Sequence, residues 1–280
     1  MSHTLAISDY DSLDSVRADC NQCFGLCCTA LPFAKSADFA FDKDGGTPCT
    51  NLRADYRCGI HQDLREKGLK GCTVYDCFGA GQKVSQVIYN GKDWRSHPAT
   101  AEEMFAVFTI VQQIQEMLWY LHEALALEVT TPFHNELRVQ IEECERLTRE
   151  SPENILRINV PELRANVNKL LILTSERVRS QIQKKKSPKK TRRSDFIGAN
   201  LKGANLSGSD LRGALLIAAD LRGADMRVTD LIGADLRDAD VSGADLTGCI
   251  FLTQVQVNAA KGDSSTKLPS YLKIPAHWVE

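Results

Sequence analysis

A five-residue repeat over residues 195–253 constrains this chain more than any other feature. A large apolar residue returns at every fifth position, and a small residue stands two positions before it. The large residues are Phe196, Leu201, Leu206, Leu211, Leu216, Leu221, Met226, Leu231, Leu236, Val241, Leu246 and Phe251. The small ones are Ala199, Ala204, Ser209, Ala214, Ala219, Ala224, Thr229, Ala234, Ala239, Ala244 and Cys249. Same-face positions of an α-helix are three or four residues apart, so this period excludes an α-helical stripe.

The pattern Ala-(Asp/Asn)-Leu-x-x, seen for example in residues 204–208, resembles the pentapeptide-repeat family. The resemblance implies a right-handed quadrilateral parallel β-helix with four pentapeptides in each coil, and hence about three coils. Small side chains let the backbone turn at the corners, while stacked Leu and Phe side chains form the core. Residues 254–280 are expected to cap the last coil, because an open β-helix end leaves backbone groups without partners.

Carboxylates line the outside of the repeats, and basic residues stand two positions after several of them. The carboxylates are Asp210, Asp220, Asp225, Asp230, Asp235, Asp240 and Asp245, and the basic residues are Lys202, Arg212, Arg222, Arg227 and Arg237. Some pentapeptide-repeat proteins are thought to imitate DNA, but three coils at about 4.8 Å spacing span only roughly 15 Å. A structural or protein-docking role is favoured, with the acidic stripe as a solvated face. Leu215 and Ile250 replace the usual Asp or Asn and could mark a contact patch.

Eight of the ten cysteines lie between Cys20 and Cys77 and are the predicted metal ligands. They are Cys20, Cys23, Cys27, Cys28, Cys49, Cys58, Cys72 and Cys77. The first four follow the spacing C-x2-C-x3-C-C, and thiolates this close on a tight loop can reach one tetrahedral ion at about 2.3 Å. In a reducing cytosol such a density of thiols is better explained by metal than by disulfides.

The order of these landmarks resembles the bacterial family of zinc- or iron-chelating proteins named for its CxxCxxxCC motif. The resemblance rests on the first four cysteines, on Pro48-Cys49, on Cys58-Gly59-Ile60 and on a final pair. It implies zinc or iron, and iron could be present as an iron–sulfur cluster. The sequence departs from the family at Ile60-His61, where the family often has Ile-Tyr, so the exact ligand set, His61 included, stays open.

The adjacent Cys27 and Cys28 raise the question of how many sites the eight thiols form. Side chains on neighbouring residues usually diverge, so two sites and one polynuclear cluster are both open. Cys144, on an expected helix, and Cys249, at a small-residue position of the repeats, are interpreted as structural. Gly79-Ala80-Gly81 lacks the third glycine of a dinucleotide site and is expected to form a turn beside the metal.

The chain is predicted to be a multidomain α+β protein. The expected parts are a cysteine-rich metal-binding segment (16–95), a helical segment packed on it (96–180), a basic linker (181–194), the repeats (195–253) and a cap and tail (254–280). Helical spacing runs through Met104, Val107, Phe108, Val111, Ile114, Met117, Leu118, Leu121 and Leu125. Thr100 is the expected N-cap of this helix, and further helices are expected over residues 133–149 and from Pro161, so that three helices could form a bundle.

Composition and termini narrow the functional classes. The chain is 43% hydrophobic with a net charge of −2, and it shows neither a signal peptide nor an uninterrupted apolar run of about 18 residues. A cytoplasmic protein without a membrane anchor is expected. The lysines and arginines of residues 181–194 permit only a weak nucleic-acid contact, because no aromatic residue is interleaved for base stacking.

Two functional hypotheses follow. The favoured one is a non-enzymatic scaffold in which the metal-binding segment accompanies a β-helix that binds another protein. The alternative is a metalloenzyme or redox protein that uses the cysteine site. No Ser-His-Asp order, P-loop or H-E-x-x-H motif accompanies the cysteines, which weakens the enzyme hypothesis without excluding it. The oligomeric state and the partner stay open.

Overall fold

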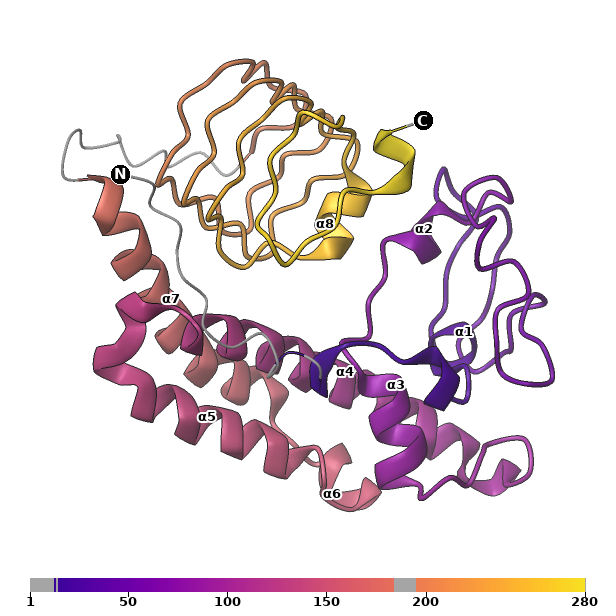
Figure 1. The fold of residues 1–280 in the computed structure, drawn as a ribbon. Helices are drawn as coiled ribbons and strands as arrows, with labels where there is room; N and C mark the ends of the chain where they lie inside the picture. The colour runs from indigo at the N-terminus through magenta and orange to yellow at the C-terminus, as the bar shows by residue number, and fades with distance from the viewer. Residues whose placement is uncertain (1–12, 14, 184–194, 280) are drawn as a thin grey trace. The chain divides into compact units, whose positions relative to one another are not determined.

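The computed structural model describes residues 13, 15–183 and 195–279, and the chain divides into two compact units (Figure 1). The first unit comprises Asp11–Leu125 and Phe133–Leu170, and contains the eight cysteines predicted to bind metal. The second comprises Met1–Tyr10, Ala126–Pro132 and Leu171–Glu280, and contains the repeats. Most of the expected basic linker lies outside the described residues, and the five domain limits drawn from the sequence stay predictions.

The described part of the chain is helical outside the repeats and the cysteine-rich loop. Its helices are α1 (Leu26–Ala30), α2 (Lys70–Thr73), α3 (Ala80–Gln82), α4 (Ala101–Leu125), α5 (His134–Leu147), α6 (Pro152–Leu156), α7 (Val160–Gln183) and α8 (Gln254–Ala259). The 3₁₀ turns are η2 (Cys20–Gln22), η4 (Pro98–Thr100), η5 (Glu128–Phe133) and η6 (Ala276–Trp278), and η3 (Lys83–Ile88) is a π-helix. No described helix is long and apolar enough to cross a bilayer.

Helix α4 confirms the longest helix predicted from the sequence. Its apolar stripe is buried from Met104 to Leu121, and Leu125 at the end is half-buried. Gln115 interrupts the stripe but is itself buried, because its Nε2 donates to the carbonyl of Phe78 at 3.1 Å. The prediction of Thr100 as N-cap is wrong: it closes the 3₁₀ turn η4, and its hydroxyl donates backward to the carbonyl of His97 at 3.0 Å.

The other two predicted helices are present as α5 and α7. Helix α5 packs against α4, and α7 begins at Val160, one residue before the predicted start. Between them the short helix α6, which the apolar pattern did not reveal, is capped by Ser151, whose hydroxyl accepts the N–H of Asn154. Arg164 of α7 donates to Gln113 of α4 at 3.3 Å, so the first half of α7 lies against the same long helix.

The loop between α1 and α2 has little regular structure and is held by a few specific contacts. Two antiparallel bridges pair Phe33 with Lys43 and Leu52 with Cys58. The Arg95 guanidinium lies 4.5 Å from the ring centroid of Tyr56 and donates to the Ala54 carbonyl at 2.8 Å. These contacts fasten the loop to the segment ahead of α4.

The repeats wind with a register of twenty residues. Parallel bridges join Asp195 to Leu215, Asn200 to Asp220, and so on up to the pair Asp230 and Ile250, always twenty positions apart. Four pentapeptides therefore make one coil, as predicted for a pentapeptide β-helix, and the stacked coils are visible in Figure 1. Among the described residues each side contributes an isolated bridge rather than a longer strand. The core contains the central Leu residues, with Leu216, Leu221 and Leu231 fully buried.

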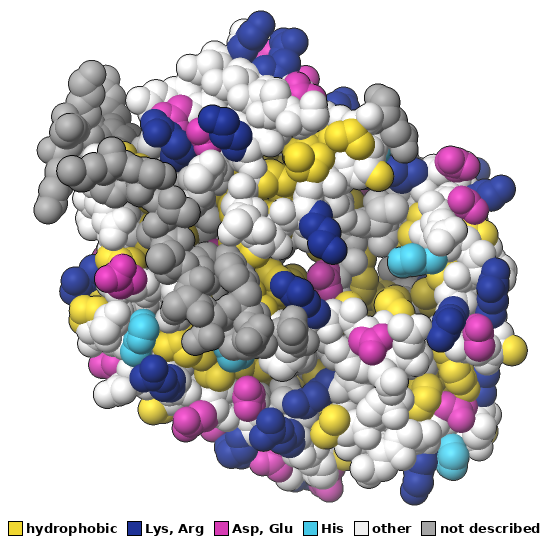
Figure 2. All heavy atoms as spheres, in the orientation of Figure 1, with side chains coloured by type: hydrophobic (Ala, Val, Ile, Leu, Met, Phe, Trp, Pro, Cys, Tyr) yellow, Lys and Arg dark blue, Asp and Glu magenta, His cyan; other side chains and the backbone are white. Residues whose placement is uncertain are grey.

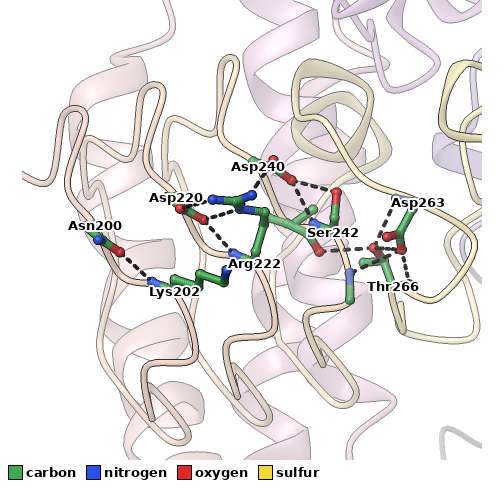
Figure 3. A network of polar contacts seen from close by, with 10 residues as sticks. Asn200, Lys202, Asp220, Arg222, Asp240, Ser242, Asp263 and Thr266 are labelled. Atoms are coloured by element: carbon green, nitrogen blue, oxygen red, sulfur yellow. Dashed lines mark hydrogen bonds and ion pairs between the residues drawn. The ribbon is translucent and has the colours of Figure 1, made fainter.

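The outward Asp and Asn residues have a structural role that the solvated-face interpretation missed. Each accepts a hydrogen bond from the N–H two residues later, as Asp220 Oδ1 does from Arg222 N at 3.2 Å and Asp240 Oδ1 from Ser242 N at 3.0 Å (Figure 3). Short polar side chains of this kind stabilise turns by capping local N–H groups. The guanidinium of Arg222 forms an ion pair with the carboxylate of Asp220 at 2.6 Å and lies 3.8 Å from the carboxylate of Asp240 in the next coil.

One side of the β-helix is covered by the end of α7. Arg179 pairs with Asp210 at 3.2 Å, and a methyl group added at Gly208 would lie 3.7 Å from Ile182. Asp230 is fully buried on the same side, and this burial raises its pKa. Arg212, at 3.0 Å, and a hydrogen bond with Ser175 of α7 oppose that rise and favour the carboxylate. Ile250 is buried, so its predicted contact patch is wrong, whereas Leu215 is 40% exposed on another side.

The last coil is closed by α8 and the tail. Thr253 and Gln256 form a capping box at the start of α8, and the Gln256 amide donates to the carbonyl of Leu231 at 2.8 Å. Lys261 then bridges to Asp240, twenty-one positions earlier, in the manner of another coil. Trp278 is buried against Gly262 and donates to the Ala260 carbonyl.

Corner glycines provide a matched test of the coil geometry. Gly223 has a φ of 63° with no atom near its absent Cβ, whereas Ala218, at the equivalent position of the preceding pentapeptide, has a φ of 54°. Left-handed backbone costs an L-residue about 1–2 kcal/mol. We expect Gly223→Ala to lower the free energy of unfolding by about 1 kcal/mol and Ala218→Gly to raise it by about 0.5 kcal/mol, in urea titrations. Equal destabilisation by both would contradict the shared corner geometry.

Candidate metal centre

The eight cysteines between Cys20 and Cys77 are free thiols on loops, on η2 and on the short helices α1 and α2. Cys20 is exposed and the other seven are half-buried. They fall into two sets. The first thiol group is Cys20, Cys23, Cys27 and Cys77, and the second thiol group is Cys28, Cys49, Cys58 and Cys72.

Two members of the first thiol group, Cys23 and Cys77, lie beside Gly81 of α3. A methyl group added at Gly81 would lie 2.6 Å from the sulfur of Cys23 and 3.7 Å from the sulfur of Cys77, so the two sulfur atoms face the same point. Cys27 packs with them against one apolar cluster that includes Val84. The absence of a side chain at Gly81 is what admits these sulfur atoms. Gly79–Gly81 was predicted to form a turn beside the metal: Gly79 lies in a turn at a φ of 83°, but Ala80 and Gly81 already belong to α3, and the place of the metal stays a prediction.

Glutamine side chains fasten the loop of the first two thiols to the helical turns that follow Cys77. Gln82 accepts from the N–H of Asp19 at 3.0 Å and donates to the carbonyl of Arg17 at 2.6 Å. Gln86 donates to the carbonyl of Gln22 at 2.8 Å. These hydrogen bonds join segments more than sixty positions apart and bring the thiols of both together.

The surroundings of Cys23 combine burial with donors aimed at its sulfur. Burial raises the pKa of Cys23 to about 11, and hydrogen bonds from the N–H groups of Leu26 and Gly25 oppose that rise. Cys77 is similar: burial raises its pKa, while N–H groups of the following turn favour the thiolate. Backbone donors directed at sulfur stabilise the charged form more than the neutral thiol, and the charged form is the one that binds metal.

Tyr75 adds a polar atom to the first thiol group. Its hydroxyl is buried and has no hydrogen-bond partner in the described part of the chain. The pKa of Tyr75 is raised by burial and then by the charges of Cys27, Cys77 and Cys23, which places the hydroxyl close to those sulfur atoms. A buried hydroxyl needs an acceptor, and a metal-bound thiolate would supply one.

The second thiol group is assembled by a backbone hairpin. Cys49 N donates to the carbonyl of Cys28 at 2.9 Å. The antiparallel bridge between Leu52 and Cys58 places Cys58 beside the segment that follows Cys49. Burial raises the pKa of Cys72 to about 11, and the charges of Cys28, Cys49 and Cys58 raise it further, so these four thiols are electrostatic neighbours.

Lys43 places a positive charge beside the second thiol group. It is only 6% exposed, and its ammonium donates to the carbonyls of Thr29 and Thr47 at 3.0 Å each and of Asp44 at 3.1 Å. Burial lowers the pKa of Lys43, and the nearby thiol charges, Cys49 first, oppose that change. An ammonium here would offset the negative charge of neighbouring thiolates.

Cys27 and Cys28 stand where the two groups meet. They occupy successive positions of α1, about 100° apart around the helix axis, and their sulfur atoms are 3.9 Å apart. A hydrogen bond between the two thiols raises the pKa of Cys27 and lowers that of Cys28, which Lys43 also favours as thiolate. The charge of Cys28 also reaches Cys20, so the groups are neighbours rather than isolated sites.

The sulfur atoms do not stand in ligand geometry. Within residues 13, 15–183 and 195–279, no three His, Cys, Asp or Glu side chains are arranged to hold a metal ion. The donor types fit zinc or iron, but their convergence would require cysteine side chains to rotate. The eight predicted ligands therefore remain a prediction, and His61 is exposed.

The two cysteines interpreted as structural are both buried. Cys144 is fully buried on α5, and Cys249 in the coils donates from its sulfur to the Met226 carbonyl at 3.0 Å. Sequence reasoning missed Lys43 and Tyr75. Their only signal was position: Lys43 follows Phe39 and Phe41 within the cysteine-rich loop, and Tyr75 lies between the last two cysteines.

Gly81 offers a test of the packing in the first thiol group. We expect Gly81→Ala to displace Cys23 and lower the free energy of unfolding by about 1–3 kcal/mol, the usual cost of overpacking. Alkylation of Cys23, followed by peptide mass mapping, should become faster. Gly91→Ala is the control for reactivity: its added methyl group would meet nothing closer than 3.8 Å, so it should lower stability only through its φ of 77°, by about 1–2 kcal/mol, and leave the alkylation of Cys23 unchanged. Unchanged reactivity of Cys23 in Gly81→Ala would contradict the close packing.

The coils place the chain among the proteins that are built in part from pentapeptide repeats. A family model described as "Pentapeptide repeats" matches residues 194–230 and 214–251. The relative "Uncharacterized protein YybG" of Bacillus subtilis (strain 168) is 67% identical over 262 residues, which is 93% of this chain and 94% of YybG. The chain therefore belongs to the pentapeptide-repeat family, in the same group as YybG.

One solved structure is similar to a part of this chain. The pentapeptide repeat protein Rfr23 from the cyanobacterium Cyanothece 51142 is 32% identical, with a TM-score of 0.22. The match covers 26% of this chain and 53% of that chain, about half its length.

Proposed function

We propose that this chain is a metal-binding pentapeptide-repeat protein whose cysteine-rich loop holds zinc or iron and whose right-handed β-helix docks another protein. The observation that carries the proposal is the gathering of eight free thiols, with backbone N–H groups directed at sulfur atoms. Thiolates are the donors that zinc and iron–sulfur clusters use most. Free thiols at this density also favour a reducing compartment, the cytoplasm.

The role of the metal in this proposal is structural. A fully thiolate set leaves no open position for substrate, in contrast to catalytic zinc. In the described residues the cysteine-rich loop has one short helix of its own, α2, and two antiparallel bridges, and most of its other backbone hydrogen bonds close local turns. Bound metal would supply the folding free energy that such a loop lacks. The scaffold hypothesis is therefore favoured over the redox or enzymatic one.

The β-helix surface supports docking of a protein rather than imitation of DNA. Arg222, Arg227 and Arg237 each pair with the Asp two positions before, at 2.6 to 2.7 Å. Acidic and basic side chains accordingly lie side by side on the face drawn in Figure 2. Charges that neutralise one another locally create little of the negative field that DNA has.

Metal analysis with an absorption spectrum tests the proposal, on protein purified anaerobically without a metal-affinity tag. Zinc without colour, or iron bound by thiolates alone, is the expected result. Iron with acid-labile sulfide and visible charge-transfer bands would instead support the redox role. Protein without metal, and unable to take up zinc or ferrous iron after reduction of its thiols, would overturn metal binding.

A further inference from the structure

We infer that the first coil of the β-helix, residues 195–214, is an open edge that pairs with the first coil of a second copy of this chain. The inference concerns the end of the β-helix and is independent of the metal. The two ends of the coil stack differ (Figure 1). The last coil is covered by α8 and by Trp278, whereas no described coil precedes Asp195. Pairing between coils therefore stops at the first coil.

The core side chains of the first coil are less buried than their equivalents in the next coil. Leu201 and Leu206 are half-buried. Leu221 and Met226, twenty positions later, are fully buried. A further coil stacked on this end would remove apolar surface from water, as each inner coil does for its neighbours.

The outer edge of the first coil carries backbone groups without partners. In the next coil Asp220 N donates to Ala199 O at 2.9 Å, and Asp220 O accepts from Leu201 N at 2.8 Å. Asn200, the equivalent of Asp220, makes neither bond within the described residues, and the same is true of Asn205. By equivalence with Asp220, each asparagine presents both its N–H and its C=O at the open end. Such an edge is a template for pairing with another chain.

The arrangement of these groups favours a second copy as the partner. Two residues that face each other in an antiparallel pair can exchange both hydrogen bonds, so each presents its N–H and its C=O to the same side. Asn200 and Asn205 meet this requirement, and a copy rotated by 180° presents the same residues in the opposite direction. A single extended peptide would pair with one side of the coil, whereas another coil end can pair with several sides at once.

Charge at this end also suits two identical surfaces. Asn205 Oδ1 accepts from Ser207 N at 3.2 Å, so the asparagine keeps the local hydrogen bond of the repeat without a negative charge. Asn200 does the same with Lys202 N. The equivalent residues of the inner coils are all aspartates, namely Asp220, Asp225, Asp240 and Asp245. Like charges directly opposite each other on paired strands are destabilising, so neutral amides at the edge favour self-association.

The dimer is expected to be weak, because its interface is small. A standard interface uses about 20–30 residues from each partner. One coil has only twenty residues, and many of their side chains point away from the open end. A dissociation constant on the order of 10 µM is expected.

The double substitution Asn200→Asp/Asn205→Asp tests the interface, because it introduces the residue that the inner coils already carry at these positions. Sedimentation velocity of the full chain over about 1–200 µM should show dimers of the unaltered protein. The variant should have a dissociation constant about tenfold higher at low salt, with partial recovery at about 0.5 M NaCl. Asn154→Asp/Asn159→Asp is the control: it makes the same charge change at two exposed residues outside the coils and should leave dimerisation unchanged.

Hydrogen exchange of single amides tests the pairing in the unaltered chain. The amides of Asn200 and Asn205 should exchange several times more slowly at about 200 µM than at about 1 µM. The amide of Leu201, which is bonded within the chain, should be protected at both concentrations.

Three results would overturn the inference. One is protein that stays monomeric up to about 200 µM. Another is protection of the two asparagine amides at every concentration, which would place a segment of the same chain on the edge. The third is a dimer that the Asn200→Asp/Asn205→Asp variant forms as readily as the unaltered protein, which would place the interface elsewhere. Metal content measured on the same samples keeps the two proposals apart, since metal-free protein that still dimerises would contradict metal binding alone.

Discussion

Removal of the metal is expected to unfold the cysteine-rich loop, residues 31–73, while the pentapeptide coils stay folded. Structural zinc supplies about 10–16 kcal/mol of apparent binding free energy in small thiolate domains. Regular structure in the described loop is limited to two antiparallel bridges and the short helix α2, and most of its other backbone hydrogen bonds close local turns. Hydrogen exchange with and without a chelator should show protection of this loop falling to the level of an unfolded chain.

The coils supply the internal control for that experiment. Their amides hydrogen bond to neighbouring coils, as Leu221 N does to Asp240 O at 2.8 Å, and no cysteine of either thiol group lies among them. Their protection should be the same in both conditions. Equal protection of residues 31–73 before and after chelation would show that metal does not fold the loop.

Leu216→Ala is expected to destabilise the coils by about 2–5 kcal/mol, the usual range for a buried leucine. Leu216 is fully buried in the middle of the stack, with a coil on either side of it. Adjacent coils share their bridges, so loss of one central side chain should weaken the coils on both sides. Urea unfolding followed by hydrogen exchange of coil amides measures the effect.

Leu201→Ala is the matched control for Leu216→Ala. Leu201 occupies the same position in the first described coil but is only partly buried, so its truncation removes less buried surface. A smaller loss than for Leu216 is expected. An equal loss would indicate that the first coil is as well covered as the second.

Much of the coil geometry could be predicted from the sequence, because the repeat is local. A period of five with apolar Leu positions defines what points inward, and the bridges twenty residues apart follow from stacking. The cover of one side by α7 could not be predicted. It depends on Arg179 meeting Asp210 and on the burial of Asp230, two long-range contacts that leave no periodic signal.

The cysteines were identifiable from their spacing, but their grouping was not. Cys77 joins Cys23 because Gln82 and Gln86 bring two distant segments together, and spacing does not encode such a contact. The buried Lys43 was equally hidden, since a lysine in a polar loop normally stays in water. The three backbone carbonyls that accept its hydrogen bonds exist only in the folded loop.

X-ray absorption at the metal edge tests the central claim most directly, because it reports the atoms bound to the ion in the intact chain. The expected result is a shell of four sulfur atoms at about 2.3 Å with no first-shell nitrogen or oxygen. A shell dominated by nitrogen or oxygen, or protein that carries no metal, would contradict a thiolate centre built from the eight cysteines.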